Sequence, residues 1–244
     1  MAEGQHKQNP ILEALGLQGG LIVSCQAPSD SPLHKPEVIA AMAEAAAQQG
    51  AVGVRIDSPA HVNAVCDRLS TSTPVPIIGL WKRQIPGYDV YITPQFEDAR
   101  AIAQAGADII AIDATARPRP GHETLPEMIA RIHEQLGKPV MADIDTMESA
   151  IAAAEAGADL IGTTLYGYTA TTQHLNPPGL DLLNTLTQLL DVPILCEGGI
   201  ASPRMAQRAL KLGAYAVVVG TAITGIDAQV SVYVSALMGT LEVP

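Results

Sequence analysis

The sequence of 244 residues contains few aromatic residues, since Phe, Tyr and Trp together make up only 3% of it. Its hydrophobic fraction of 48% therefore consists mainly of Ala, Val, Ile and Leu. This composition excludes disorder as the main state of the chain. It favours buried parallel strands flanked by Ala-rich helices over a β-sandwich or a membrane barrel.

Basic residues are also scarce, because 14 Lys and Arg stand against 25 Asp and Glu and give a net charge of −11. Without any run of Lys or Arg, we expect no nucleic-acid partner and favour a small-molecule partner. The three cysteines, Cys25, Cys66 and Cys196, are odd in number and lack Cys-x-x-Cys spacing. This pattern supports neither a disulfide framework nor a zinc ribbon and fits a reducing compartment.

Long hydrophobic runs are missing as well. No apolar run reaches the roughly 18 residues of a membrane-spanning helix, and residues 1–10 have no apolar segment typical of a signal peptide. We therefore expect a cytoplasmic protein with no membrane partner. The length suits one α/β barrel, a fold that takes about 250 residues.

The sequence does contain a fourfold repeat. A Gly-Ala pair follows an Ala-rich stretch and precedes an apolar run at Gly50, Gly106, Gly157 and Gly213, at nearly constant intervals. Each glycine is the expected end of a helix, where positive φ is needed, and each apolar run is an expected buried strand. A second set of apolar runs falls between these, which predicts strands at 21–25, 52–56, 77–80, 108–113, 140–144, 159–164, 194–196 and 215–220.

Eight strands that alternate with helices predict a closed (β/α)8 TIM barrel. We expect a single domain over residues 1–244, with residues 1–18 forming an N-terminal arm and a short helix that caps the barrel floor. An open doubly wound sheet is the alternative, but the constant period and the lack of G-x-G-x-x-G favour closure. The expected helices are 10–15, 36–49, 59–69, 95–105, 123–136, 146–156, 180–190, 203–212 and 228–237.

Polar residues follow the predicted strands, at the end of a TIM barrel that carries its chemistry. Lys82 and Glu197 follow the third and seventh strands, which are opposed in a ring of eight. They are therefore placed to act on two faces of one carbon. A single charged residue at a strand end can equally well pair with a neighbour. The other polar residues at strand ends are Gln26, Arg55, Asp113, Asp143, Thr163 and Thr164.

Glycines follow the last two strands. Gly198 and Gly199 precede Ser202, a predicted helix cap, and Gly220 precedes Thr221. Backbone N–H groups in these two loops are a common phosphate site, so we predict phosphate binding there, with ordinary tight turns as the alternative.

The histidines, the cysteines and a group of aspartates give weaker indications of a functional site. The histidines lack metal-ligand spacing and are expected at the surface, while Cys25 and Cys196 are expected to pack in the core. Asp113, Asp143 and Asp145 offer a less favoured magnesium site.

Several motifs together resemble the N-acetylmannosamine-6-phosphate 2-epimerase family. The resemblance extends from about residue 19 to 226, and Tyr-Ile-Thr-Pro and Gly-Thr-Thr-Leu-x-Gly-Tyr-Thr are its specific signals. Glu-Gly-Gly alone is a weak signal, since many phosphate-binding barrels contain it. The motifs lie at 20–26, 79–83, 90–94, 143–145, 162–169, 196–198 and 220–224.

The resemblance implies a TIM barrel of the ribulose-phosphate-binding type. It would interconvert N-acetylmannosamine 6-phosphate and N-acetylglucosamine 6-phosphate in sialic acid breakdown, without a metal or an organic cofactor. The implied catalytic residues are Lys82 and Glu197, and the implied substrate contacts are Gln26, Arg55 and Asp143, to which we add Thr164. Lys82 could serve both faces of C2, or Glu197 could act as the second acid and base or assist ring opening.

The sequence departs from the family pattern after Thr224, where Gly225 replaces an arginine that binds phosphate. Backbone N–H groups, Arg204 or another residue would have to compensate. The alternatives are a ribulose-phosphate 3-epimerase, a thiazole synthase, a flavin barrel and an inactive phosphosugar-binding sensor. The apolar segment 230–241 predicts a homodimer.

Overall fold

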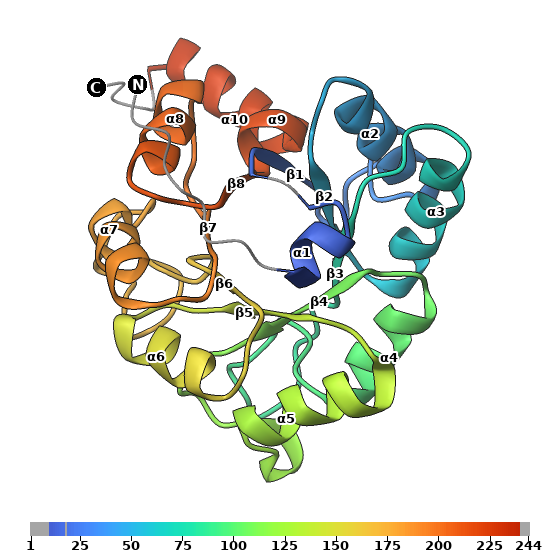
Figure 1. Cartoon of the computed structure of the whole chain (residues 1–244). Helices are drawn as coiled ribbons and strands as arrows, with labels where there is room; N and C mark the ends of the chain where they lie inside the picture. Colours follow the sequence, from blue (N-terminus) through green and yellow to red (C-terminus); the bar gives the residue numbers. More distant parts are fainter. Residues whose placement is uncertain (1–9, 18, 240–244) are drawn as a thin grey trace.

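The computed structural model describes residues 10–17 and 19–239. Eight parallel strands form a closed barrel in sequence order, with β1 paired to both β2 and β8 (Figure 1). The predicted TIM barrel is therefore confirmed. The strands are β1 Leu21–Cys25, β2 Gly53–Asp57, β3 Ile77–Leu80, β4 Ile109–Asp113, β5 Val140–Asp143, β6 Leu160–Gly162, β7 Ile194–Glu197 and β8 Ala216–Val219.

Helices surround this barrel and mostly match the predicted ranges (Figure 1). The expected helix 123–136 is divided, because a π-helical turn, η2, follows α5. A short helix, α9, was not expected. The elements are α1 Pro10–Ala14, α2 Pro36–Gln48, α3 Pro59–Ser70, α4 Phe96–Gln104, η1 Pro120–His122, α5 Leu125–Arg131, η2 Ile132–Leu136, α6 Met147–Glu155, α7 Leu180–Leu189, α8 Pro203–Lys211, α9 Thr221–Thr224 and α10 Ile226–Leu237.

The alternation of side chains along each strand creates two apolar clusters. Outward-facing residues such as Val54 and Ile110 pack beneath the helices, and Cys25 and Cys196 belong to this cluster as expected. Inward-facing residues such as Ile78 and Leu195 fill the barrel. Successive strand residues face opposite sides, so the next inward positions toward the C-terminal ends carry the polar side chains.

The floor of the barrel is closed from the N-terminal side. Leu12 of α1 and Leu17 are both buried in the inner cluster with Ile22. The Tyr215 hydroxyl donates a 2.6 Å hydrogen bond to the Leu17 carbonyl. The predicted floor-capping helix is present, while residues 1–9 and 18 of the predicted arm lie outside the described residues.

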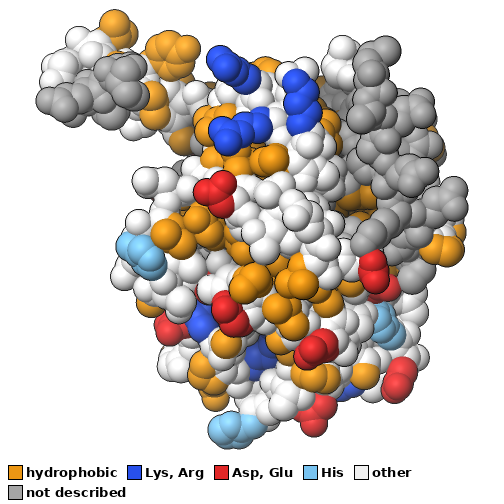
Figure 2. Space-filling model, turned by 60° about the vertical axis from the view of Figure 1, so that its left-hand side comes forward, with side chains coloured by type: hydrophobic (Ala, Val, Ile, Leu, Met, Phe, Trp, Pro, Cys, Tyr) orange, Lys and Arg blue, Asp and Glu red, His pale blue; other side chains and the backbone are white. Residues whose placement is uncertain are grey.

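The last helix differs from the others because α10 has no buried residue. It projects from the barrel, and hydrophobic side chains are exposed along the projecting part in Figure 2. Among the residues that the structure describes, no helix has both the length and the apolar character required to cross a membrane. The large exposed apolar side chains of α10 are Ile226, Val230, Val232, Tyr233, Val234 and Leu237.

Candidate active site

A cavity of about 970 Å³ lies at the C-terminal ends of the strands. The predicted site residues that line it come from six of the eight strands, either from the strand itself or from the loop that follows. All of the predicted site residues except Asp143 line its wall. Those that do are Gln26, Arg55, Lys82, Thr164, Glu197, Gly198, Gly199, Gly220 and Thr221.

Arg55 lies on the bottom of the cavity with a side chain that is only 1% exposed. Two of its nitrogens donate to the carboxylate of Asp143, at 3.1 and 2.7 Å. The same guanidinium lies 3.2 Å from Glu197 Oε2. Burial disfavours the charged guanidinium, but the two carboxylates outweigh it and raise the pKa of Arg55. Arg55 is therefore a fixed cation beneath any molecule in the cavity.

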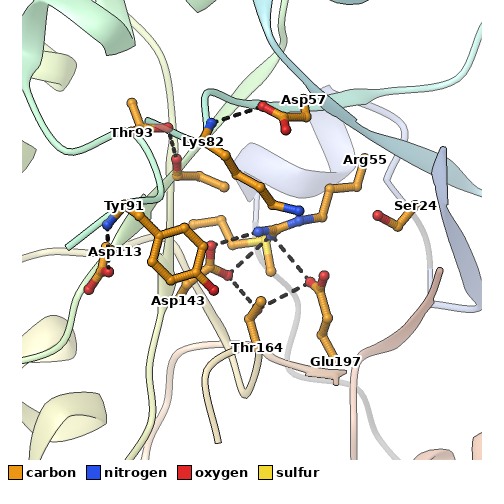
Figure 3. Close-up of polar contacts among 12 residues, drawn as sticks. Ser24, Arg55, Asp57, Lys82, Tyr91, Thr93, Asp113, Asp143, Thr164 and Glu197 are labelled. Atoms are coloured by element: carbon orange, nitrogen blue, oxygen red, sulfur yellow. Dashed lines mark hydrogen bonds and ion pairs between the residues drawn. The ribbon is translucent and has the colours of Figure 1, made fainter. Parts of the chain in front are cut away.

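Asp143 lies behind Arg55 instead of in the cavity wall (Figure 3). Its side chain is fully buried, and it accepts a 2.5 Å hydrogen bond from the Thr164 hydroxyl as well as both bonds from Arg55. These contacts orient Arg55 and Thr164. A direct contact between Asp143 and a substrate stays a prediction.

Glu197 ends β7 and faces Arg55 from the other side (Figure 3). Its Oε2 accepts from Thr164 at 3.2 Å. Burial raises the pKa of Glu197 to about 7, against the opposing effect of Arg55 and with a further upward contribution from Asp143. Both protonation states of this carboxyl are consequently accessible near neutral pH.

Lys82 follows β3 and extends into the same cavity (Figure 3). Its backbone N–H donates to Asp57 Oδ1 at 2.9 Å, which fixes its main chain to the end of β2. Its Nζ donates to Gln26 Oε1 at 2.5 Å, and Gln26 in turn donates to Ser24 Oγ at 2.8 Å. Lys82 also lowers the pKa of Glu197, so the two groups act on each other electrostatically across the barrel.

The glycine loops after β7 and β8 form another part of the wall. Gly198 and Gly199 have φ values of 94° and 70°. A Cβ at Gly199 would lie 2.6 Å from Pro177 Cβ, so the loop packs too closely for any other residue. Ser202 caps α8 by accepting from the Met205 N–H, as predicted.

Gly225 also lines the cavity, and its surroundings exclude the family arginine in this backbone arrangement. A Cβ there would lie 2.8 Å from Thr221 Cα, a backbone atom. Arg204, considered above as a substitute, is exposed on α8 and is not among the cavity residues. Arg204 as a replacement stays a prediction that this structure does not test. The structure places His34 in the wall instead.

Two further expectations are corrected. His61 is only 5% exposed, so the expectation that every histidine lies at the surface is wrong. Its imidazole is buried because it bonds the turn between β2 and α3. The three aspartates of the less favoured magnesium site have separate partners: Arg117 bonds Asp113, Arg55 bonds Asp143 and Ser149 bonds Asp145.

Tyr91 is a cavity residue that we did not single out from the sequence, although it begins the Tyr-Ile-Thr-Pro motif. Burial raises its pKa to about 12, with Asp143 and Asp113 contributing in the same direction. The phenol therefore stays protonated near neutral pH. It is a hydrogen-bond donor on the side of the cavity that faces Arg55 and Asp143 (Figure 3).

A closed (β/α)8 barrel with ionisable side chains that converge at the C-terminal ends of its strands is a TIM-barrel enzyme. The family model described as "Putative N-acetylmannosamine-6-phosphate epimerase" matches residues 39–238. The chain belongs to this N-acetylmannosamine-6-phosphate epimerase family.

Similar proteins agree with this assignment. The chain is 64% identical over 222 residues to a protein of Synechococcus elongatus described as "Putative N-acetylmannosamine-6-phosphate 2-epimerase", covering 91% of this chain and 94% of that protein. A protein of the same description from Thermosynechococcus vestitus is 62% identical, with 94% and 98% covered. The solved N-acetylmannosamine-6-phosphate 2-epimerase from Clostridium perfringens has a TM-score of 0.85 and 35% identity, with 99% and 100% covered.

The charge cluster around Arg55 leads to a stability prediction. Replacing Arg55 with leucine leaves the buried carboxylates of Asp143 and Glu197 without their cation, so we expect the free energy of unfolding to fall by about 3 to 5 kcal/mol. Chemical denaturation measures this change. The matched control, Arg68→Leu, breaks an exposed pair with Glu44 and should cost about 1 kcal/mol or less. Equal losses in the two variants would contradict the central role of Arg55 in the cluster.

Proposed function

We propose that this chain interconverts N-acetylmannosamine 6-phosphate and N-acetylglucosamine 6-phosphate by removing and returning the proton at C2. The observation that carries the proposal is the convergence of Lys82 and Glu197 from the opposed strands β3 and β7 on one cavity with Arg55 at its bottom. Family membership supports the same reaction.

The first step is proton removal. The C2 proton becomes acidic once the sugar ring has opened, because C2 then lies next to the C1 aldehyde. The amine of Lys82, in its neutral form, takes this proton, and the C–H electron pair moves into an enolate whose negative charge rests on the C1 oxygen. Arg55, kept cationic by its two carboxylates, stabilises that charge, as would the donor Tyr91.

The second step returns a proton to the opposite face of C2. Glu197 supplies it in one direction and accepts it in the reverse direction. The raised pKa of about 7 suits this double role, because both the acid and the carboxylate are populated near neutral pH. Thr164 hydrogen-bonds Glu197 and Asp143, and so holds the carboxyl beside Arg55.

A direct assay tests the proposed function. Purified protein in EDTA is given N-acetylmannosamine 6-phosphate, and the appearance of N-acetylglucosamine 6-phosphate is followed by NMR. We expect turnover that EDTA does not reduce. Tight binding without turnover would contradict the proposal and indicate a phosphosugar-binding sensor.

Phosphate recognition gives a second prediction. We propose that backbone N–H groups of the loops containing Gly198, Gly199, Gly220 and Thr221 bind the 6-phosphate. N-acetylmannosamine without phosphate should then have a kcat/KM lower by roughly 100-fold or more, since remote binding energy is lost. Inorganic phosphate should inhibit competitively. Equal kcat/KM values for the two sugars would contradict the assignment.

We also propose a homodimer in which α10 contributes to the interface. Ile226, Val230, Tyr233 and Leu237 recur at helical spacing and are each more than half exposed. Burial of one such side chain stabilises an assembly by about 1.5 to 3 kcal/mol. Light scattering should therefore show a dimer that Val230→Asp together with Tyr233→Asp converts to monomer. The control Ser231→Asp adds charge to the same helix and should leave the mass unchanged. A wild-type monomer would contradict the proposal.

The proposed location is the cytoplasm. All three cysteines are free thiols, with Cys25 and Cys196 buried. Free thiols fit a reducing compartment, where a phosphorylated amino sugar would also be supplied.

A further inference from the structure

Ser58 connects β2 to α3 in a backbone conformation that serine rarely adopts. Its φ of 76° and ψ of 147° lie in a region that is populated almost only by glycine. The residue is half-buried and lines the cavity. Strain of this kind persists where the surrounding structure enforces it, and it concentrates at functional sites.

The side chain of Ser58 also does not cap the helix that follows it. Ser58 is the N-cap residue of α3, but it makes no capping hydrogen bond. Thr124, Thr146 and Ser202 hold the same position in α5, α6 and α8, and each accepts from a backbone N–H of its helix. The hydroxyl of Ser58 instead lies 3.0 Å from Nδ1 of His61. A serine that served only to start the helix would show neither the strained φ nor the missing capping hydrogen bond.

His61 determines which way the Ser58 proton points. Its Nδ1 also lies 3.0 Å from the Asp57 carbonyl, which can only accept, so Nδ1 carries the hydrogen. Burial lowers the pKa of His61 and favours this neutral form with a single N–H. The Ser58 hydroxyl therefore does not donate to His61. Within the described part of the chain, no other hydrogen bond of this hydroxyl is present, which leaves its proton free for a molecule in the cavity.

The turn is fixed to the strand that carries the proposed base. Asp57 pairs with Leu80 in the sheet, so Ser58 lies beside the residues that precede Lys82. The Ser58 N–H donates to the Leu80 carbonyl at 2.8 Å, and the Lys82 N–H donates to Asp57 Oδ1. His34 packs edge-on against the His61 ring, with 4.6 Å between the centroids. The backbone of Ser58 is thus fixed beside the strand that precedes Lys82, and both residues line the same cavity.

We infer that Ser58 binds substrate: its hydroxyl donates a hydrogen bond to a sugar oxygen next to the carbon that Lys82 deprotonates, and His61 positions that hydroxyl. The inference rests on the proposed epimerase function and adds to it a contact that recognises the C1–C2 part of the sugar. Its occupant is an uncharged hydroxyl or carbonyl oxygen, or the enolate oxygen that forms during the reaction.

Two variants of Ser58 separate the contact from the strain. Ser58→Ala and Ser58→Gly both remove the hydroxyl, so both should lower kcat/KM by roughly 5-fold to 100-fold. Their stabilities should differ, because glycine adopts this φ without strain while alanine does not. We expect Ser58→Gly to melt a few degrees above Ser58→Ala. The control Thr124→Ala removes a working cap and should lower the melting temperature while leaving kcat/KM unchanged.

A double-mutant cycle tests the positioning role of His61. His61→Phe keeps an aromatic ring but removes the N–H, and should lower kcat/KM in the wild type yet have little further effect in Ser58→Gly. If the wild type is active and Ser58→Gly retains full activity, the Ser58 contact is overturned while the proposed function stands. Additive losses in the cycle would overturn the role of His61. A wild type without turnover would overturn the proposed function and this contact together.

Discussion

Replacing Lys82 with alanine is expected to lower kcat by roughly 10²-fold to 10⁴-fold, because the base that removes the C2 proton is lost. The protein should remain folded, since the Lys82 side chain is exposed and makes its hydrogen bond to Gln26 within the open cavity. Steady-state kinetics and the melting temperature of the purified variant measure the two effects separately.

A lysine elsewhere on the surface is the control. Lys211→Ala removes an exposed lysine of α8 that hydrogen-bonds Gln207 on the same helix, so both kcat and stability should stay near wild-type values. If Lys82→Ala retained activity within tenfold of the wild type, Lys82 would not be the base.

Replacing Glu197 with glutamine is expected to abolish interconversion while leaving proton exchange at C2 of one epimer. Lys82 can still deprotonate its face in this variant, but nothing delivers a proton to the other face. NMR in D₂O follows exchange and inversion in the same sample. Parallel loss of both would contradict the two-base assignment and indicate that Glu197 acts in ring opening, in which case substrate with a larger open-chain fraction should partly restore both.

The same variant should become more stable than the wild type as pH rises. The folded-state pKa of Glu197, about 7, lies above its ordinary value of 4.5, so the folded state favours the protonated carboxyl. Wild-type stability contributed by this group is fully present below about pH 4.5 and is lost as pH rises through about 7. Glutamine does not ionise, so the variant should exceed the wild type by on the order of 1 to 3 kcal/mol above that range. A difference that is constant with pH would contradict the raised pKa.

The barrel could be predicted because each βα unit carries strong local signals. Gly50, Gly106, Gly157 and Gly213 all adopt positive φ after a helix, as their positions before buried strands indicated. The start of the expected helix 123–136 has a local signal, because Thr124 and Glu127 form a capping box. Its division was not predictable, because the π-helical turn that follows packs against α4, a contact that the local sequence does not reveal. The short helix α9 and the exposed face of α10 likewise depend on tertiary context.

The site was partly predictable for a related reason. Strand alternation and barrel closure place Arg55, Lys82 and Glu197 in one cavity, so the sequence pattern sufficed for them. The same pattern does not reveal how far below the cavity surface a side chain lies. Asp143 lies at a predicted strand end like the other three residues, but the structure places it behind Arg55. The guanidinium occupies the space between that carboxylate and the cavity.

Residues that reach the cavity from irregular segments were missed. Tyr91 lies next to Ile92, which pairs with Lys82 in a bridge that the sequence did not predict. This pairing turns the loop after β3 back on itself. Ser58 lines the cavity from a backbone turn with positive φ at a serine, for which the sequence gives no signal, and His61 of α3 bonds this turn. Their positions follow from tertiary contacts, not from local preference.

The most direct test of the central claim is the wild-type reaction in D₂O with N-acetylmannosamine 6-phosphate that carries ordinary hydrogen at C2. If Lys82 and Glu197 exchange the C2 proton through groups open to solvent, the N-acetylglucosamine 6-phosphate that forms should carry deuterium at C2 from the first turnovers, as NMR or mass spectrometry would show. Product that retains the original hydrogen at C2 would contradict the account, because inversion would then proceed without the proposed two-residue proton transfer.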